Sequence, residues 1–518
     1  MPRLFAETCI LAHSLGIKYV WIDSICIRQD KEEEWNREAP QMARYYQNAW
    51  VTVVAANNAM ANGLLNMRRT EPVPRMTRLP YMDVNGEQNG YFYLQSTRPD
   101  VLQKEYSVGV GDSELLQRGW VFQEWRLSRR IIAFSDSGFF LHCHTLGSMS
   151  PLGDHFNGAG VRLGQNSRYD DHIMQDRDFS PSSEWEDIVA KYSGLGLTYL
   201  TRDRLMALAG VASEVGRTIK ALKVTSSIPG PILSDDVLAR QYVCGLWLTH
   251  IHRGLIWEQA TPGFRERLPG IPTWSWASMA SHVTDGDDKR VLTGMRVRWP
   301  RKDFYQRQRQ MVCAIHKATT VPVDIQNLLP QFSDRPVPDY VPEYEYGNEN
   351  RFVVLTIYSP LMPIQIERLL SVVDADLADE VTSALGNRSD EYESDPRIMH
   401  LDHPSRKGLW RCICLPTDPS RIVGWASVEH PELQSDEKIA SSSGSIYALF
   451  LERCEEKGGW FHWGSALISR VVFTILLVRR VSIPGFNESF ERVGVGRLFG
   501  EEVNRRYLST EKTTMSLV

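Results

Sequence analysis

A strand–loop–helix–strand pattern near the N-terminus constrains the fold of this chain more than any other feature. The apolar run Tyr19–Ile27 carries one carboxylate, Asp23, in its middle. A polar, acidic loop follows, and apolar or aromatic residues then recur at helical spacing over residues 35–49. A second apolar run, Trp50–Ala56, is rich in β-branched residues. This order of elements predicts a parallel α/β layer.

Asp23 is a candidate functional residue, because a buried strand seldom contains Asp unless its carboxylate is paired with another group or takes part in binding or catalysis. It would lie near the carboxyl end of the predicted strand, where α/β folds place their sites. It is therefore either a catalytic or ribose-binding carboxylate, or a structural acceptor for a loop or Arg side chains. We expect Cys26, in the same run and without a His close in sequence, to be an inert core thiol.

A second unusual string, RGWVFQEWRLSRRIIAF, spans Arg118–Phe134. Two Trp residues bracket a Gln-Glu pair, and a cluster of Arg residues precedes a short apolar strand. Glu124 of this pair is a second candidate carboxylate. The alternative is that Glu124 forms a salt bridge with Arg118, Arg126 or Arg129.

Together, these stretches resemble the heterokaryon incompatibility (HET) domain of filamentous fungi. That family reads roughly LGI-[RK]-Y-x-WID-x-x-CI-x-QD, then W-x-x-E-x-x-x-M-x-x-x-Y-x-x-A, then RGW-x-x-QE-x-x-LS-x-R. Three later strings, ending with PTWSWAS at Ser278, resemble the tails of long HET proteins. The matching positions are Leu15–Tyr19, Trp21–Asp23, Cys26, Ile27, Gln29, Asp30, Trp35, Glu38, Met42, Tyr46, Ala49 and 118–130.

The N-terminus departs from the family pattern. Family members usually begin with a strand of the type Y-x-x-LSY-x-WG, whereas this chain enters the first helix directly, with Leu4, Leu11 and Leu15 on one face. We therefore expect an N-terminally truncated HET domain over residues 1–145, through a lost upstream exon or in a shortened paralogue. The missing strand would be central in a parallel sheet, so its loss would expose apolar surface on both neighbours.

The resemblance also implies a fold and a role. It implies an α/β module with an open parallel sheet of the TIR or flavodoxin type. The implied role is non-self recognition: the module triggers growth arrest or cell death after fusion with an incompatible strain. It would act by assembly with an incompatibility partner protein or with itself. This hypothesis predicts exposed apolar helices and concentration-dependent self-association.

An enzymatic alternative follows from the same resemblance, because HET domains look like distant relatives of TIR domains, some of which cleave NAD with one Glu. The equivalent is Glu38, which otherwise would be a helix-dipole partner. Cleavage passes through an oxocarbenium-like state that a carboxylate stabilises. NAD would be a substrate, with no resident cofactor. A pocket would join Asp23, Glu38 and Glu124, with Arg118 or Arg126 as donors. A third hypothesis is an inert, degenerate paralogue.

Composition excludes some classes of function. The 518 residues include 58 basic and 63 acidic side chains, for a net charge of −5, which argues against a nucleic-acid partner. The best apolar run, 466–478, contains Arg470 and is too short to span a membrane. Eight scattered Cys residues fit a reduced, cytoplasmic protein. His142-Cys143-His144 and Cys412-x-Cys414 lack a second half at zinc spacing, so no metal is expected.

The rest of the chain is expected to form two further regions. Helical periodicity predicts a helical region over residues 184–278, with one of its helices over Tyr242–Trp257. A Pro-, Tyr- and Glu-rich linker is predicted over Arg335–Asn350. Short runs of β-forming residues beyond it predict a β-rich C-terminal module over 350–518.

Overall fold

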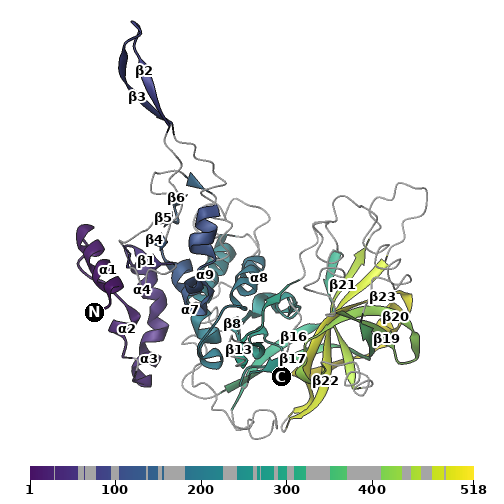
Figure 1. Ribbon diagram of the computed structural model, residues 1–518. Coiled ribbons are helices and arrows are strands. Elements are labelled where there is room, and N and C mark those ends of the chain that lie inside the picture. Colours follow the sequence, from purple (N-terminus) through teal and green to yellow (C-terminus); the bar gives the residue numbers. More distant parts are fainter. Residues whose placement is uncertain are drawn as a thin grey trace. The chain divides into compact units, whose positions relative to one another are not determined.

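The structure is a computed structural model in which the chain divides into two compact units (Figure 1). Unit 1 comprises Met1–Phe179 and Met206–Ser227, and unit 2 comprises Ser180–Leu205 and Ile228–Val518. The predicted linker Arg335–Asn350 lies outside the described residues. The residues that the structure describes are 1–28, 30–56, 63–64, 77–94, 104–135, 138–149, 155–156, 181–225, 242–260, 265–268, 270–284, 290–299, 308–322, 351–369, 410–433, 445–456, 470–483 and 486–518.

Unit 1 begins with helix α1 (Arg3–Ser14), as its apolar spacing predicted. Leu4 and Leu11 of this helix pack beside the sheet. The helix ends at Ser14; Gly16, just beyond it, has a φ of +72° that favours glycine, and the Ile17 N–H donates to the Ala12 carbonyl at 2.8 Å.

The strand predicted over Tyr19–Ile27 is wrong. Residues 19–22 pair with no described strand, and residues Asp23–Cys26 form the short helix α2. The Asp23 carboxylate accepts the Ser24 N–H at 2.7 Å, so a local turn replaces a strand ladder. Tyr19 is 87% exposed, and Cys26 is also exposed, so the expectation of a core thiol is wrong too.

The helical pattern and the second strand are confirmed. Helix α3 (Glu32–Glu38), the 3-10 turn η1 (Ala39–Gln41) and helix α4 (Met42–Asn48) follow one another. The tighter turn contains Pro40, which lacks the N–H that a continuous helix would use. Strand β1 (Thr52–Ala55) follows within the second apolar run.

The sheet of unit 1 is mixed. Strand β1 pairs parallel with β4 (Arg130–Ser135), with Val54 opposite Ala133. Strands β5 (Gly138–Cys143), β6 (Gly147–Met149) and β7 (His155–Phe156) extend it in antiparallel fashion, since short connections permit only that direction. The described strands therefore form a mixed sheet with one parallel pair. This confirms that unit 1 combines helices with a partly parallel sheet, whereas the expected TIR or flavodoxin type stays a prediction.

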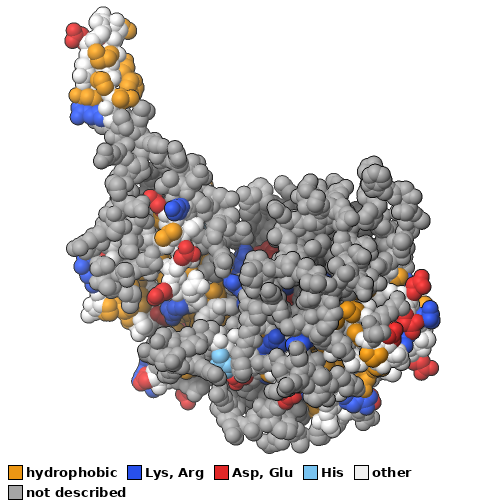
Figure 2. Space-filling model, turned by 45° about the vertical axis from the view of Figure 1, so that its right-hand side comes forward, with side chains coloured by type: hydrophobic (Ala, Val, Ile, Leu, Met, Phe, Trp, Pro, Cys, Tyr) orange, Lys and Arg blue, Asp and Glu red, His pale blue; other side chains and the backbone are white. Residues whose placement is uncertain are grey.

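Strands β2 (Thr77–Met82) and β3 (Gln88–Leu94) form an antiparallel hairpin. Figure 2 shows orange, apolar side chains gathered on it. Tyr81 and Phe92 meet edge to face, with ring centroids 5.1 Å apart. A two-stranded hairpin of this kind is marginally stable in water without a partner surface. Its exposed apolar side chains are Leu79, Tyr81, Met82, Val84, Tyr91 and Phe92.

Helix α7 (Gly119–Leu127) packs on α4 within unit 1. Helix α9 (Leu200–Thr225) begins in unit 2 and ends in unit 1. Its Gly210 N–H donates to the Gln123 side-chain oxygen of α7 at 2.7 Å. A Cβ on Gly210 would overlap with the Ala43 side chain of α4, so the close approach requires glycine.

In unit 2, helix α8 (Pro181–Tyr192) agrees with the predicted helical spacing, but the helix expected over Tyr242–Trp257 is wrong. That segment forms the hairpin strands β8 (Tyr242–Val243) and β9 (Leu246–Trp247), then the short helices η5 (Leu248–His250) and α11 (Ile251–Gly254). The turn residues Cys244 and Gly245 have φ of 46° and 88°, as a tight hairpin requires.

Short strands follow the hairpin in unit 2. Strand β10 (Glu258–Gln259) pairs with β14 (Val297–Arg298). Strands β11 (Glu266–Arg267), β12 (Met279–Thr284) and β13 (Arg290–Gly294) form a second small sheet.

The C-terminal part is β-rich, as predicted, and is built around a ten-stranded, largely antiparallel sheet. Its core is an apolar cluster that includes Ile413, Phe450 and Phe473. Helix α15 (Glu501–Ser509) contributes the buried Val503 to this core. The strands are β15 (Gln308–Met311), β16 (Ala314–Pro322), β17 (Arg351–Pro363), β18 (Gln365–Leu369), β19 (Trp410–Leu415), β20 (Asp418–Val428), β21 (Ile446–Glu456), β22 (Arg470–Ile483), β23 (Phe486–Phe499) and β24 (Lys512–Leu517).

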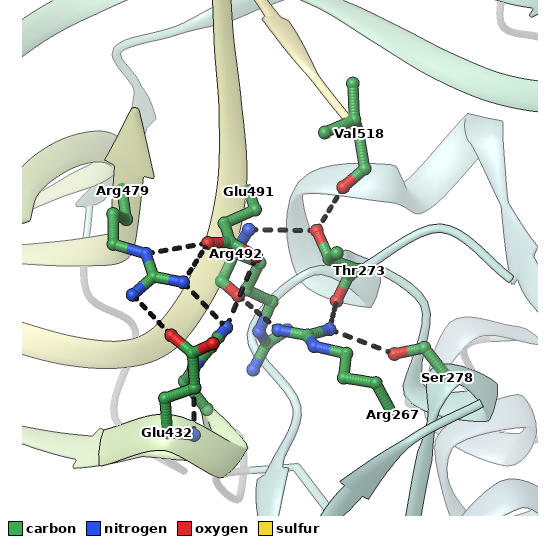
Figure 3. Close-up of polar contacts among 9 residues, drawn as sticks. Arg267, Thr273, Ser278, Glu432, Arg479, Glu491, Arg492 and Val518 are labelled. Carbon is green, nitrogen blue, oxygen red and sulfur yellow. Dashed lines mark hydrogen bonds and ion pairs between the residues drawn. The ribbon is translucent and has the colours of Figure 1, made fainter. Parts of the chain in front are cut away.

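A buried arginine joins this sheet to the earlier part of unit 2 (Figure 3). Arg492 is 1% exposed. Its guanidinium donates to the Leu255 carbonyl at 2.8 Å and to the Glu429 carboxylate at 3.0 Å, and lies 3.4 Å from the centroid of the Trp257 ring. Thr273 accepts the Arg492 backbone N–H at 2.9 Å. These contacts tie together segments far apart in sequence.

No helix among the described residues is both long and apolar enough to cross a membrane.

Candidate functional site

Unit 1 contains a groove of about 890 Å³. Its walls come from helix α1, the segment 17–23, helix α4, strand β1 and helix α7. Most of its lining is apolar, with a small polar group at the Asp23 end. Pockets of this size and composition are the usual places for ligands, so we take this groove as the candidate site.

Strand β1 presents an open edge to the groove. It stands at the end of its sheet, and among the described strands only β4 pairs with it. The Ala56 N–H donates to the Phe134 carbonyl at 2.8 Å, on the β4 side. Because backbone groups alternate in direction along a strand, those of Val53 and Ala55 face away from β4, toward the groove.

The opposite wall is also extended backbone. Residues Lys18–Ile22 belong to no helix or strand, and Ile22 has extended dihedral angles, φ −134° and ψ 120°. Among the described residues, no acceptor is found for the N–H groups of this segment. The groove therefore has hydrogen-bonding backbone on two facing walls.

Apolar side chains close the two remaining sides. Leu4 and Leu11 of α1 pack with Val53 and Ala55 on one face of the strand. Helices α4 and α7 supply the other face, where Thr52 bonds to Ser128 with its hydroxyl at 2.6 Å. The lining on that side includes Tyr46, Ala49, Val121 and Trp125.

The polar end brings together Asp23, Arg118 and Glu124, three of the residues singled out in the sequence. The pKa of the Glu124 carboxyl is raised from 4.5 to about 7, mainly by burial; a hydrogen bond from Tyr46 opposes the rise, and the nearby Asp23 carboxylate adds to it. Burial also raises the pKa of the Tyr46 hydroxyl. A carboxyl group with a pKa near neutrality can act as an acid at neutral pH.

Glu38 is placed differently. It is not among the groove-lining residues. Its carboxylate accepts the Tyr45 hydroxyl at 2.6 Å and the Arg37 Nε–H at 3.1 Å. The Tyr45 hydrogen bond, with a smaller contribution from Arg37, lowers its pKa. Glu38 is therefore held as a carboxylate near the surface, and its predicted catalytic role stays a prediction.

The two arginines predicted as donors, Arg118 and Arg126, also differ in their position relative to the groove. Arg118 is exposed and lines the groove at the start of α7. Arg126, on the same helix, is 9% exposed and is not among the lining residues. Of the two predicted donors for a bound nucleotide, the structure thus brings only Arg118 to the groove.

The sequence did not assign a role to Tyr46. Tyr46 stood at a recurring aromatic position, which gave a signal for packing and none for its bond to Glu124. The Trp21 ring meets the Tyr46 ring edge to face, with centroids 5.8 Å apart, and lies tilted against the Tyr45 ring, with centroids 5.0 Å apart.

The metal-type motifs form no cluster among the described residues. No group of three or more His, Cys, Asp or Glu side chains there could hold a metal ion. His142, on β5, bonds through its ring to the Ser148 hydroxyl at 2.9 Å. Cys412 and Cys414 lie buried on β19.

Comparison with known proteins finds a family match in the N-terminal part of the chain. Residues 1–124 match the family described as heterokaryon incompatibility protein (HET). This range holds α1–α4, β1 and the Arg118–Glu124 end of the groove, and it confirms the resemblance read from the sequence. No curated protein matches the chain, and no solved structure does either.

Proposed function

We propose that this HET-domain protein acts in fungal non-self recognition, triggering growth arrest or cell death after fusion with an incompatible strain. In this proposal it acts in the cytoplasm, by assembling with an incompatibility partner or with further copies of itself. The HET match over residues 1–124 supports the general role.

The observation that carries the assembly mechanism is the apolar surface of the hairpin β2–β3, whose exposed side chains include Tyr91 and Phe92. Such patches commonly mark interaction surfaces. Ile10 of α1 is exposed as well.

A second candidate function is cleavage of NAD. The favouring observation is that Glu124, with a pKa of about 7, lies in a groove also lined by Asp23 and Arg118. A protonated Glu124 could serve as an acid, and the Asp23 carboxylate could stabilise an oxocarbenium-like state. Glu38, outside the lining residues, would need another route to the substrate.

The test is inducible expression of the chain in a filamentous fungus, with growth, membrane permeability and cellular NAD followed together. Glu124→Gln and Glu38→Gln serve as matched variants, because each exchanges one carboxyl for an amide of the same size. Cell death with NAD unchanged, in wild type and in both variants, supports assembly. Cell death and NAD loss that both disappear in Glu124→Gln support the enzyme.

Two further results would count against the proposal. NAD loss that disappears only in Glu38→Gln would support cleavage through that residue. A folded, abundant protein that causes neither death nor NAD loss would contradict both functions and favour the inert paralogue.

A further inference from the structure

The two faces of the hairpin β2–β3 differ in character. Leu79 lies directly opposite Phe92 in the strand register, and the Tyr81 ring meets the Phe92 ring edge to face, so these three side chains share one face. Because side chains alternate along a strand, Arg78 and Tyr91 belong to the other face. There the Arg78 guanidinium lies 3.2 Å from the centroid of the Tyr91 ring. We call the first set, Leu79, Tyr81 and Phe92, the apolar face.

The apolar face is exposed to solvent. Leu79 is 41%, Tyr81 42% and Phe92 55% exposed, and Figure 2 shows apolar side chains gathered over the hairpin. Among the described strands, β2 and β3 pair only with each other. A two-stranded hairpin gains independent stability only when further strands or another layer pack against it. The apolar face therefore lacks the second layer that a stable sheet of this kind needs.

The edges of the hairpin do not favour a partner strand. In β2, Pro80 has no N–H to donate to a neighbour. In β3, Gly90 has a φ of 112°, and the strand register shifts between Pro80 and Met82, as at a β-bulge. Proline and bulges keep other strands from adding to an edge. An added strand would also leave the apolar face uncovered, so the partner surface must lie against this face.

The charges at the two ends of the hairpin favour a second copy of the chain as the partner. Asp83 and Glu87 lie at the turn, Arg78 lies near the open end, and the apolar face between them contains no charged side chain. If two copies stack their apolar faces in antiparallel fashion about a two-fold axis, the acidic turn of each lies over the basic end of the other. The same acidic turn disfavours an anionic lipid surface, because like charges repel.

We propose that the hairpin β2–β3 is a self-association element, in which the apolar faces of two copies pack against each other with the hairpins antiparallel. Face-to-face packing of sheets is a common way to bury such side chains, and aromatic pairs add to the attraction. The inference rests on the assembly function proposed above. It names the partner as a second copy and the contact as Leu79, Tyr81 and Phe92.

The contact is expected to be weak. The three side chains expose on the order of 300 Å² in each copy, so two copies would bury about 600 Å² between them. Stable complexes bury at least about twice this area. We therefore expect an association that depends on concentration and is absent from dilute chain.

Sedimentation equilibrium of the purified full chain, at concentrations up to on the order of 100 μM, measures this association. Two neighbouring exposed rings on opposite faces of β3 provide matched variants: Phe92→Glu on the apolar face and Tyr91→Glu on the other. The wild type should form dimers. Phe92→Glu should weaken the association by at least about tenfold, because the dimer would bury its charge. Tyr91→Glu should associate like the wild type, since its carboxylate lies beside Arg78 and outside the contact.

A mixture of variants with opposite charge separates a lost contact from a disturbed hairpin. Phe92→Glu and Phe92→Lys should each stay monomeric alone, because each would place like charges against each other at the two-fold axis. An equimolar mixture should recover dimers, since opposite charges then meet at the contact. Hairpins that had lost their structure would not recover in this way, so recovery identifies the partner as a second copy.

Three results would overturn the inference. These are a wild-type chain that stays monomeric over the whole range, equal association of wild type and Phe92→Glu, and no recovery of dimers in the mixture. Binding of monomeric wild type, but not of Phe92→Glu, to vesicles of phosphatidylcholine and phosphatidylserine would assign the apolar face to a membrane instead. The cellular test is separate: dimers in solution without death in the fungus contradict the proposed function, and death without dimers contradicts only this inference.

Discussion

At the scale of single residues, Glu124 lies in a site that favours its protonated form. Burial holds the pKa of its carboxyl at about 7, against 4.5 for the free side chain. A raised folded-state pKa means that the native state binds more protons than the unfolded state between these values. The contribution of Glu124 to stability is therefore largest below pH 4.5 and is lost as the pH rises toward 7.

Replacing Glu124 by Gln should remove this pH dependence. Between pH 4.5 and 7, the free energy of unfolding of the wild type should fall through Glu124 by on the order of 1–3 kcal/mol, a value that allows for the partial exposure of the side chain. The variant should not show this fall. Hydrogen exchange in α4 and α7, compared between wild type and variant across this range, measures it. The control Glu38→Gln should leave this fall in place, because the pKa of Glu38 is lowered: its contribution is present above pH 4.5 and is lost only as the pH falls below that value. A pH dependence that is the same in wild type and Glu124→Gln would contradict the burial of this carboxyl.

A second residue-scale prediction concerns the buried pair Arg492–Glu429. Arg492→Met would leave the Glu429 carboxylate buried without its cation and should lower the free energy of unfolding of unit 2 by about 3–5 kcal/mol. The matched control is Arg480→Met, because Arg480 and Glu488 form an exposed pair, for which we expect a loss below about 1 kcal/mol. Urea unfolding monitors both. Equal losses of unfolding free energy in the two variants would show that the burial of the Arg492–Glu429 pair does not affect stability.

At the scale of elements, the packing of α9 against α4 and α7 depends on Gly210. Gly210→Ala would improve helix propensity by roughly 0.5–1 kcal/mol, but its Cβ would overlap with Ala43 and approach Gln123 to 2.7 Å. Overpacking should dominate, for a net loss of about 1–3 kcal/mol in unit 1. Ser213→Ala, one turn further along the same helix, should change stability by less than about 1 kcal/mol. Thermal unfolding compares the two, and a stabilised Gly210→Ala would show that the helices can separate at no cost.

The elements also show what the sequence could and could not predict. Periodicity gave α1, α3–α4, β1 and β4, because each of these follows from repeated local spacing. It failed at Tyr19–Ile27, where the apolar run contains a helical turn, Asp23–Cys26, in which the Asp23 side chain accepts the Ser24 N–H. It failed again near Cys244, where hairpin geometry depends on two positive φ angles that apolar spacing does not reveal.

The candidate site was predictable in part for the same reason. The Trp-flanked and strand-end carboxylates, Glu124 and Asp23, were chosen as charged residues in apolar surroundings, and both line the groove. Glu38 was chosen by resemblance, and its position outside the lining depends on how α3 turns at Pro40. The bond from Tyr46 to Glu124 depends on tertiary packing, which residue spacing cannot specify.

At the scale of the whole molecule, the chain has two compact units, each with its own core. Units with separate cores unfold as separate cooperative steps unless a shared element couples them. Helix α9 is shared, but the two perturbations above act at different places: Gly210 contacts α4 and α7 in unit 1, and Arg492 lies within unit 2. We therefore expect two transitions in a calorimetric scan of the full chain. Gly210→Ala should lower the midpoint of one transition by a few degrees, and Arg492→Met should lower the midpoint of the other. A single transition whose midpoint both variants lower alike would mean that α9 couples the unfolding of the two units. In that case, the loss of unfolding free energy in the double variant would differ from the sum of the losses in the two single variants.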